Sequence, residues 1–109
     1  MPAIQQRLLP ETLRSRAAST FTGSYQTLGS VLSNMSRILK ITNNTSVDVT
    51  ISWDGTNDHE FLPIGTFVLL DETANAVPQS MLAAAKGTQF YVKAAAGTGT
   101  VYLSTYYAT

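Results

Sequence analysis

The chain has 109 residues, with seven basic and seven acidic side chains, one histidine and no cysteine. This length suits one domain that can bury a core without a disulfide or a metal. The lack of cysteine excludes a disulfide framework, a thiolate metal site and a cysteine nucleophile. Charged residues make up 13% of the chain, about half the usual share, which indicates a surface that packs against copies or partners.

The charges are distributed unevenly along the chain. Residues 1–40 carry five basic and one acidic side chain, a net charge of +4, whereas residues 41–109 carry two basic and six acidic ones, a net charge of −4. This pattern predicts a basic N-terminal arm, residues 1–20, and an acidic body, residues 21–109. No apolar run is long enough for a membrane helix, and the N-terminus lacks the apolar core of a secretion signal. We expect no membrane partner and a protein kept inside the producing cell until assembly.

The predicted arm contains scattered apolar residues and three arginines. The segment from Glu11 to Ala18 has the composition for two helical turns after Pro10, which is too short for a stable isolated helix. We expect the arm to order on another subunit, with leucines as anchors and arginines pairing with acids; a free terminus is the alternative. The expected contact residues are Arg7, Leu8, Leu9, Leu13, Arg14 and Arg16.

The stretch from Val47 to Pro63 is the expected centre of the fold. Its first half alternates apolar and polar residues up to Trp53, which is typical of a strand with one buried face. Asp54-Gly55 then favours a tight turn, and the chain returns through Phe61 and Leu62. The sequence therefore predicts a central antiparallel hairpin.

Further strands are expected on both sides of this hairpin. We predict a hairpin turn at Asn43–Ser46, a loop from Asp71 to Gln79, a short helical stretch or connection at Ser80–Gly87, and a hairpin loop at Gly97–Gly99. These signals predict an all-β fold, a small antiparallel β-sandwich or barrel of about seven strands with an extended N-terminal arm. The other predicted strands are Phe21–Leu28, Arg37–Thr42, Thr66–Leu70, Thr88–Ala94 and Thr100–Tyr107.

One cluster of acidic and imidazole groups, Asp54, Asp58, His59 and Glu60, is the place where a metal or a general acid–base pair would sit. Its spacing does not fit a calcium loop, and a zinc site needs more nitrogen or sulfur ligands than one histidine supplies. We interpret the cluster as hairpin polarity in which Asp54 shapes the turn. No catalytic residue, metal, cofactor or small-molecule substrate is therefore expected, and the protein is predicted not to be an enzyme.

Aromatic side chains form a second candidate site. They suit either a platform for sugars or a surface that packs against the arm or a neighbouring subunit. The basic segment lacks interleaved aromatics and a nucleic-acid-binding motif, so we expect a protein partner and not nucleic acid. The expected aromatic contact surface consists of Trp53, Tyr91, Tyr102, Tyr106 and Tyr107.

Several segments together resemble small structural proteins of tailed bacteriophage particles, of the head, neck or tail accessory type. The resemblance covers roughly Ser24 to Tyr107, and the residues before Phe21 have no counterpart. It implies a virion component that multimerises and has no active site. The segments that carry it are RILKITNNT (37–45), VDVTISWDG (47–55), Asp58-His59, Leu62-Pro63, KGTQFYVK (86–93) and GTGTVY (97–102).

The residues and the resemblance together predict a homo-oligomeric structural component of a bacteriophage virion, assembled in the host cytoplasm and in contact with other virion proteins. Its position, whether capsid, head-to-tail connection, collar or fibre attachment, stays open. The alternative is a carbohydrate-binding module that mediates attachment to a host surface.

Overall fold

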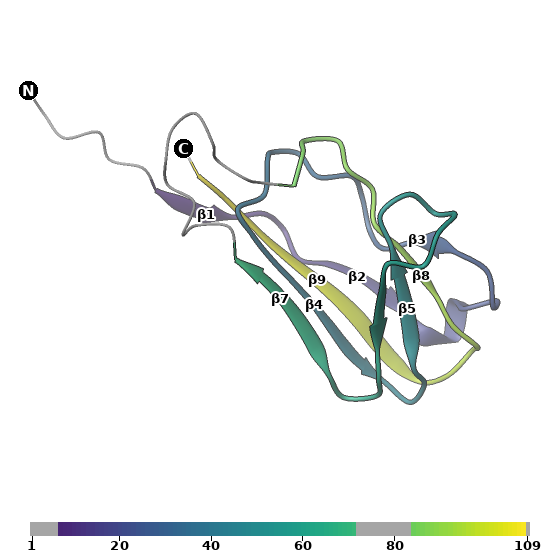
Figure 1. The fold of residues 1–109 in the computed structure, drawn as a ribbon. Helices are drawn as coiled ribbons and strands as arrows, with labels where there is room; N and C mark the ends of the chain where they lie inside the picture. Colours follow the sequence, from purple (N-terminus) through teal and green to yellow (C-terminus); the bar gives the residue numbers. More distant parts are fainter. Residues whose placement is uncertain (1–6, 72–83, 109) are drawn as a thin grey trace, which may run out of the picture.

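Two antiparallel sheets pack face to face in the computed structural model, which describes residues 7–71 and 84–108 (Figure 1). The first sheet contains β1 (Leu8–Pro10), β2 (Arg14–Ala17), β4 (Ile38–Thr45), β7 (Phe67–Asp71) and β9 (Gly99–Ala108). The second contains β3 (Gln26–Thr27), β5 (Val49–Ser52), β6 (Glu60–Leu62) and β8 (Tyr91–Lys93). A 3-10 turn, η1 (Ala18–Thr20), follows β2. The predicted small all-β sandwich is confirmed.

The strand order explains how the two layers are joined. In the first sheet the order is β1-β9-β4-β7, with β2 also pairing with β9, and in the second it is β3-β8-β5-β6. The connections from β4 to β5, from β6 to β7 and from β8 to β9 therefore all pass from one sheet to the other. β6 and β7 are edge strands of their respective sheets and follow one another in the chain.

The core lies between the sheets and follows the period-2 alternation of the strands. In β9, Val101, Leu103 and Thr105 are buried, and the residues between them face outward. In β5, Val49 and Ile51 point toward the same core from the opposite sheet. Apolar burial of this kind is the main favourable term that holds the layers together.

Two of the predicted hairpins are wrong. Asn43 to Thr45 continue β4 instead of turning, and β4 and β5 belong to different sheets. The Gly97–Gly99 loop likewise leads from β8 in one sheet to β9 in the other. The hairpin of β5 and β6 forms as predicted, with Val49 opposite Leu62.

The remaining strand predictions differ mainly in length. The segment expected as a strand from Phe21 to Leu28 contributes only the two residues of β3. The predicted loop at 72–79 and the first half of the stretch Ser80–Gly87 lie outside the described residues. Where the description resumes, Ala84 forms an isolated antiparallel bridge with Ser36.

The N-terminal segment is part of the sandwich, so the boundary expected after residue 20 does not separate an arm from a body. Leu8 lies opposite Ala108 and Arg14 lies opposite Leu103, both in antiparallel register with β9. Ala18 is fully buried in the core. The helical turns expected after Pro10 are replaced by β2, because the long edge of β9 offers this segment a ladder of backbone hydrogen bonds.

Asn43 ties the end of β4 to the second sheet. Its side chain is fully buried, and Nδ2 donates to the carbonyl oxygens of Val47 and Leu62, both at 2.9 Å. Its Oδ1 accepts from the backbone N–H of Thr45 at 3.1 Å and from the Thr45 hydroxyl at 2.6 Å. The side-chain amide of Asn43 thus forms hydrogen bonds with backbone groups both in the β4–β5 connection and at the end of β6.

Candidate functional site

The residues expected to contact a partner through the arm divide into two groups. Arg14 and Arg16 lie on the core side of β2, because they are opposite the buried Leu103 and Val101. The Arg16 guanidinium donates to the carbonyl oxygen of Thr27 at 3.0 Å. Both guanidinium groups therefore form hydrogen bonds within the chain. The exposed members of the predicted set are Arg7, Leu8 and Leu13, and Leu9 is half-buried.

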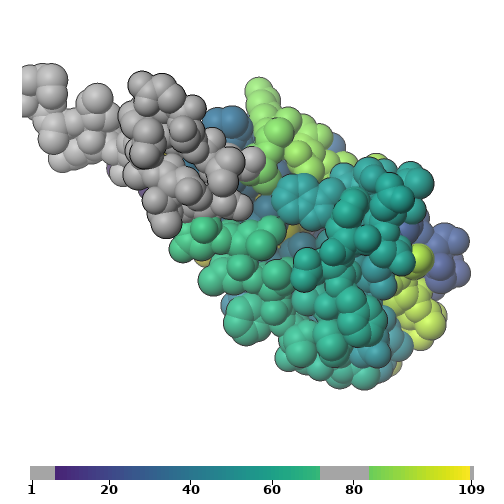
Figure 2. Space-filling view, viewed as in Figure 1, coloured from purple at the N-terminus to yellow at the C-terminus, as the bar shows by residue number. Residues whose placement is uncertain are grey.

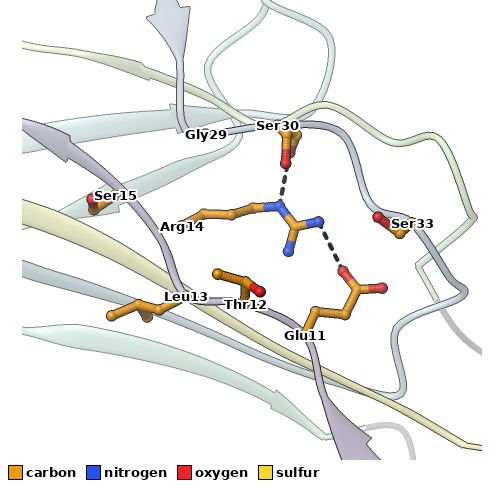
Figure 3. Close-up of a pocket in the computed structure, with 8 residues that line it drawn as sticks. All are labelled: Glu11, Thr12, Leu13, Arg14, Ser15, Gly29, Ser30 and Ser33. Atoms are coloured by element: carbon orange, nitrogen blue, oxygen red, sulfur yellow. Dashed lines mark hydrogen bonds and ion pairs between the residues drawn. The ribbon is translucent and has the colours of Figure 1, made fainter.

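A buried ion pair fixes the N-terminal segment beneath a cavity of about 390 Å³ (Figure 3). Arg14 Nη2 lies 2.8 Å from Glu11 Oε1, and both side chains are more than nine-tenths buried. Arg14 Nη1 donates to the Thr105 hydroxyl at 3.0 Å, and Asn34 Nδ2 donates to Glu11 Oε2 at 2.8 Å. As Figure 3 shows, the Arg14 guanidinium points toward Ser30 and Glu11 across the cavity.

All three guanidinium nitrogens of Arg14 donate to groups of the protein. Nε donates to the carbonyl oxygen of Ser30 at 2.9 Å and Nη2 to that of Val31 at 2.8 Å. Burial acts to raise the pKa of Glu11, but hydrogen bonds from Asn34 and Arg14 outweigh it, so the pKa lies below its ordinary value. The carboxylate is thus ionised and neutralises the cation. This arrangement anchors the chain and does not present an unpaired charge to an anion.

The acidic and imidazole cluster is used to build the loop after β5. Asp54 Oδ1 accepts from the backbone N–H groups of Thr56 and Asn57 at 2.8 and 2.9 Å, and these bonds hold the pKa of Asp54 well below its usual range. His59 Nδ1 accepts from the backbone N–H of Trp53 at 3.0 Å. Asp54 therefore shapes the turn, as the sequence predicts.

Asp58 belongs to a separate surface group on the second sheet. It accepts hydrogen bonds from the Tyr25 hydroxyl and from Lys93 Nζ, the latter at 3.0 Å. Burial and the Asp58 carboxylate raise the pKa of Tyr25 to about 12, whereas the pKa of Asp58 is lowered by its bonds with Tyr25 and Lys93. Within residues 7–71 and 84–108, no three His, Cys, Asp or Glu side chains are placed to hold a metal ion.

The structure does not bring the five predicted aromatic residues into one surface. Tyr102 and Tyr106 alternate with the buried residues of β9 and so lie on the outer face of the first sheet. Tyr91 lies on the outer face of the second sheet, where Gly55 approaches its ring. Trp53 packs edge-on against Phe90, with ring centroids 4.7 Å apart. Tyr107 has the opposite orientation to Tyr106 along β9 and lies across from Leu9.

Four exposed apolar side chains lie on β6, on β7 and in the turn between them, and none of them is among the residues predicted for contact. Phe61, Ile64, Phe67 and Leu69 are each more than half exposed. In Figure 2 the β6 and β7 segments, coloured teal to green, lie on the face turned to the viewer. We call these four residues the β6–β7 patch. The sequence feature that indicates this surface is the run Phe67-Val68-Leu69-Leu70. It is apolar on both faces, which is typical of a strand that is covered on both sides.

Compared with known protein families, with curated proteins and with solved structures, the chain has no significant match. In the part of the chain that the structure describes, no helix has the length and apolar character needed to cross a membrane.

Proposed function

We propose that the protein is a multimerising structural component of a bacteriophage virion and not an enzyme. The observation that carries this proposal is the β6–β7 patch: four large apolar side chains, each more than half exposed, at neighbouring edges of the two sheets. Large apolar side chains exposed on adjoining segments are typical of protein–protein interfaces. The low charge of the chain favours the same function.

The assignment to a virion is supported by the resemblance of the segments 37–45, 47–55, 86–93 and 97–102 to small structural proteins of tailed phages. In the fold, these segments contain all of β4, β5 and β8 and the start of β9, and these four strands form the centres of both sheets. The partners proposed are further copies of the chain and other virion proteins, assembled in the host cytoplasm. The exposed Arg7, Leu8 and Leu13 are the residues of the N-terminal segment that remain proposed for contact with such partners.

The test is the composition of the particle. Phage particles purified from cells that produce this protein are expected to contain it in multiple copies, measured by quantitative mass spectrometry and by immunogold labelling. Its absence from intact particles would overturn the proposal. Glycan binding by purified protein that is lost in Trp53→Ala would instead support the alternative, a carbohydrate-binding module.

A further inference from the structure

We propose that β7 pairs in antiparallel orientation with β7 of a second copy of this chain, about a two-fold axis at Leu69. The two first sheets then form one continuous sheet across the axis. This pairing supplies an interface for the proposed assembly function. Only its role in the particle rests on the proposed function.

The register of β7 on β4 fixes the direction of its backbone groups. The backbone N–H of Asn43 donates to the carbonyl oxygen of Thr66 at 2.8 Å, and its C=O accepts from the N–H of Gly65 at 3.1 Å, so Asn43 directs both backbone groups toward the β7 side. Ile41 and Leu39, two and four residues along β4, do the same. Bonded pairs alternate along an antiparallel ladder, so Val68 and Leu70 direct their N–H and C=O groups toward β4. Phe67 and Leu69 direct theirs away from β4, in the plane of the sheet.

Within its described residues, β7 contains few of the features that protect sheet edges from pairing. It spans five residues without proline or lysine, and its register on β4 is uninterrupted from Phe67 to Asp71. The opposite edge of the same sheet is broken into β1 and β2 and contains Pro10. β6, at the edge of the second sheet, has three residues and is followed by Pro63. Among the described edges, β7 is therefore the one suited to receive another strand.

Self-pairing about Leu69 matches the side chains as well as the backbone. It places Leu69 beside its own copy and Phe67 opposite Asp71 of the second copy, all on the outer face of the sheet. Lys40 Nζ already lies over the Phe67 ring, 4.8 Å from its centroid. The Asp71 carboxylate of the second copy thus arrives beside the Lys40 ammonium. A carboxylate accepts several hydrogen bonds, so this contact adds to those that Asp71 makes within its own chain.

The two-fold arrangement uses one surface twice, so a single set of residues satisfies both partners. The same Lys40–Asp71 contact forms on each side of the axis, and the net charge of zero means that two copies do not repel as wholes. A second copy therefore fits this edge better than a partner of unrelated sequence.

Cysteine cross-linking of the purified full chain tests the pairing directly, because the chain has no cysteine of its own. Opposed residues of a bonded pair have Cα atoms about 5.5 Å apart, which is within the range of a disulfide. Leu69→Cys is expected to form a covalent dimer on mild oxidation. The matched control is Met35→Cys, since Met35 is 55% exposed and Leu69 51%, but Met35 lies in the loop between β3 and β4, outside the β6–β7 patch.

The register is tested by mixing two variants. Phe67→Cys mixed with Asp71→Cys is expected to give more disulfide-linked dimer than either variant alone. Cross-linking of Leu69→Cys no faster than that of Met35→Cys overturns the proposal. Efficient linking of Phe67→Cys to Leu69→Cys without self-linking of Leu69→Cys moves the axis and overturns the proposed register.

Sedimentation of the uncross-linked protein gives an independent readout. Leu69→Lys places like charges beside each other at the axis and is expected to raise the dimer dissociation constant at least about tenfold, with an unchanged circular dichroism spectrum. Met35→Lys, at an equally exposed position outside the patch, is expected to leave the constant unchanged. A wild-type monomer, or a Leu69→Lys dimer of unaltered affinity, overturns the proposal. These results do not depend on the particle, so a dimer that is absent from virions refutes the proposed function alone.

Discussion

Arg14 and Glu11 form a buried ion pair, with Nη2 and Oε1 2.8 Å apart, between the end of the first N-terminal strand and the start of the second. The Thr105 hydroxyl connects the two groups, since it accepts from Arg14 Nη1 at 3.0 Å and lies 3.3 Å from Glu11 Oε1. Because Thr105 belongs to β9, this network attaches the N-terminal segment to the centre of the first sheet. A segment rich in arginine is thereby part of the core.

Removal of the cation alone is expected to destabilise the protein strongly. Arg14→Met leaves the Glu11 carboxylate buried without its counterion, which is expected to lower the free energy of unfolding by about 3–5 kcal/mol. The double variant Glu11→Gln/Arg14→Met removes both charges and should be more stable than Arg14→Met. Urea denaturation followed by circular dichroism measures both. Arg7→Met, at an exposed position, is the control and should change stability by less than about 0.5 kcal/mol.

The Glu11–Arg14 pair also predicts that the free energy of unfolding depends on pH in the acidic range. The pKa of Glu11 is lower in the folded protein than its ordinary value of 4.5, so the folded state favours the ionised form. Its contribution is therefore complete above the ordinary pKa and is lost as the pH falls through the folded value. Denaturation midpoints measured from pH 7 down to pH 3 should decrease less steeply in Glu11→Gln than in the wild type. Parallel curves would show that Glu11 does not contribute.

Deletion of residues 1–19 gives a third prediction, which separates the observed fold from the one expected from sequence. An arm that orders on a partner would be dispensable for the body. In the structure the deletion removes β1, β2, the Arg14 network and the buried Ala18. We therefore expect the truncated chain to lose its cooperative thermal transition and its near-ultraviolet circular dichroism. A truncated protein that melts as cooperatively as the full chain would contradict the structural role of this segment.

The sequence predicted which segments form strands better than it predicted which strands pair with each other. Alternation around Val49 and Ile51 identified β5, and Asp54-Gly55 identified its hairpin with β6, because both signals are local. The arginines suggested an exposed arm, since burial of Arg14 depends on Glu11, Thr105 and the carbonyl groups of residues 30 and 31, which the fold brings together. A neighbour in space that is distant in sequence leaves no local pattern.

The β4–β5 connection shows the same limit. Asn43 and Thr45 have the composition of a turn, yet both are buried within β4. The carbonyl groups that Asn43 binds come partly from residues 62 and 63, so its role depends on tertiary structure. Polar residues that usually mark a turn here satisfy the backbone where the chain changes sheets.

Asn43→Ala is expected to be among the most destabilising single substitutions. It leaves the carbonyl oxygen of Leu62 and the N–H of Thr45 without the Asn43 side chain, whereas the Val47 carbonyl still accepts from the Thr45 hydroxyl at 2.8 Å. Each unsatisfied buried group costs about 1–3 kcal/mol, so the loss from these two groups should reach at least about 2 kcal/mol. Asn44→Ala is a matched control, because Asn44 is the next residue of the same strand and is exposed. Equal unfolding midpoints for the two variants would refute the role assigned to Asn43.

Glycine at position 99 is required for a close approach of two strands as well as for its backbone angle. Gly99 begins β9 with φ of +89°, and a Cβ atom there would overlap the carbonyl oxygen of Asn44 in β4. Gly23 has a similar φ of +85°, but nothing lies within 4 Å of a Cβ atom at that position. Gly23→Ala should therefore cost only the backbone strain, about 1–2 kcal/mol. Gly99→Ala should cost about 1–3 kcal/mol more, because β9 must shift away from β4. Thermal unfolding measures the difference between the two variants, and equal losses would mean that the strand contact imposes no constraint.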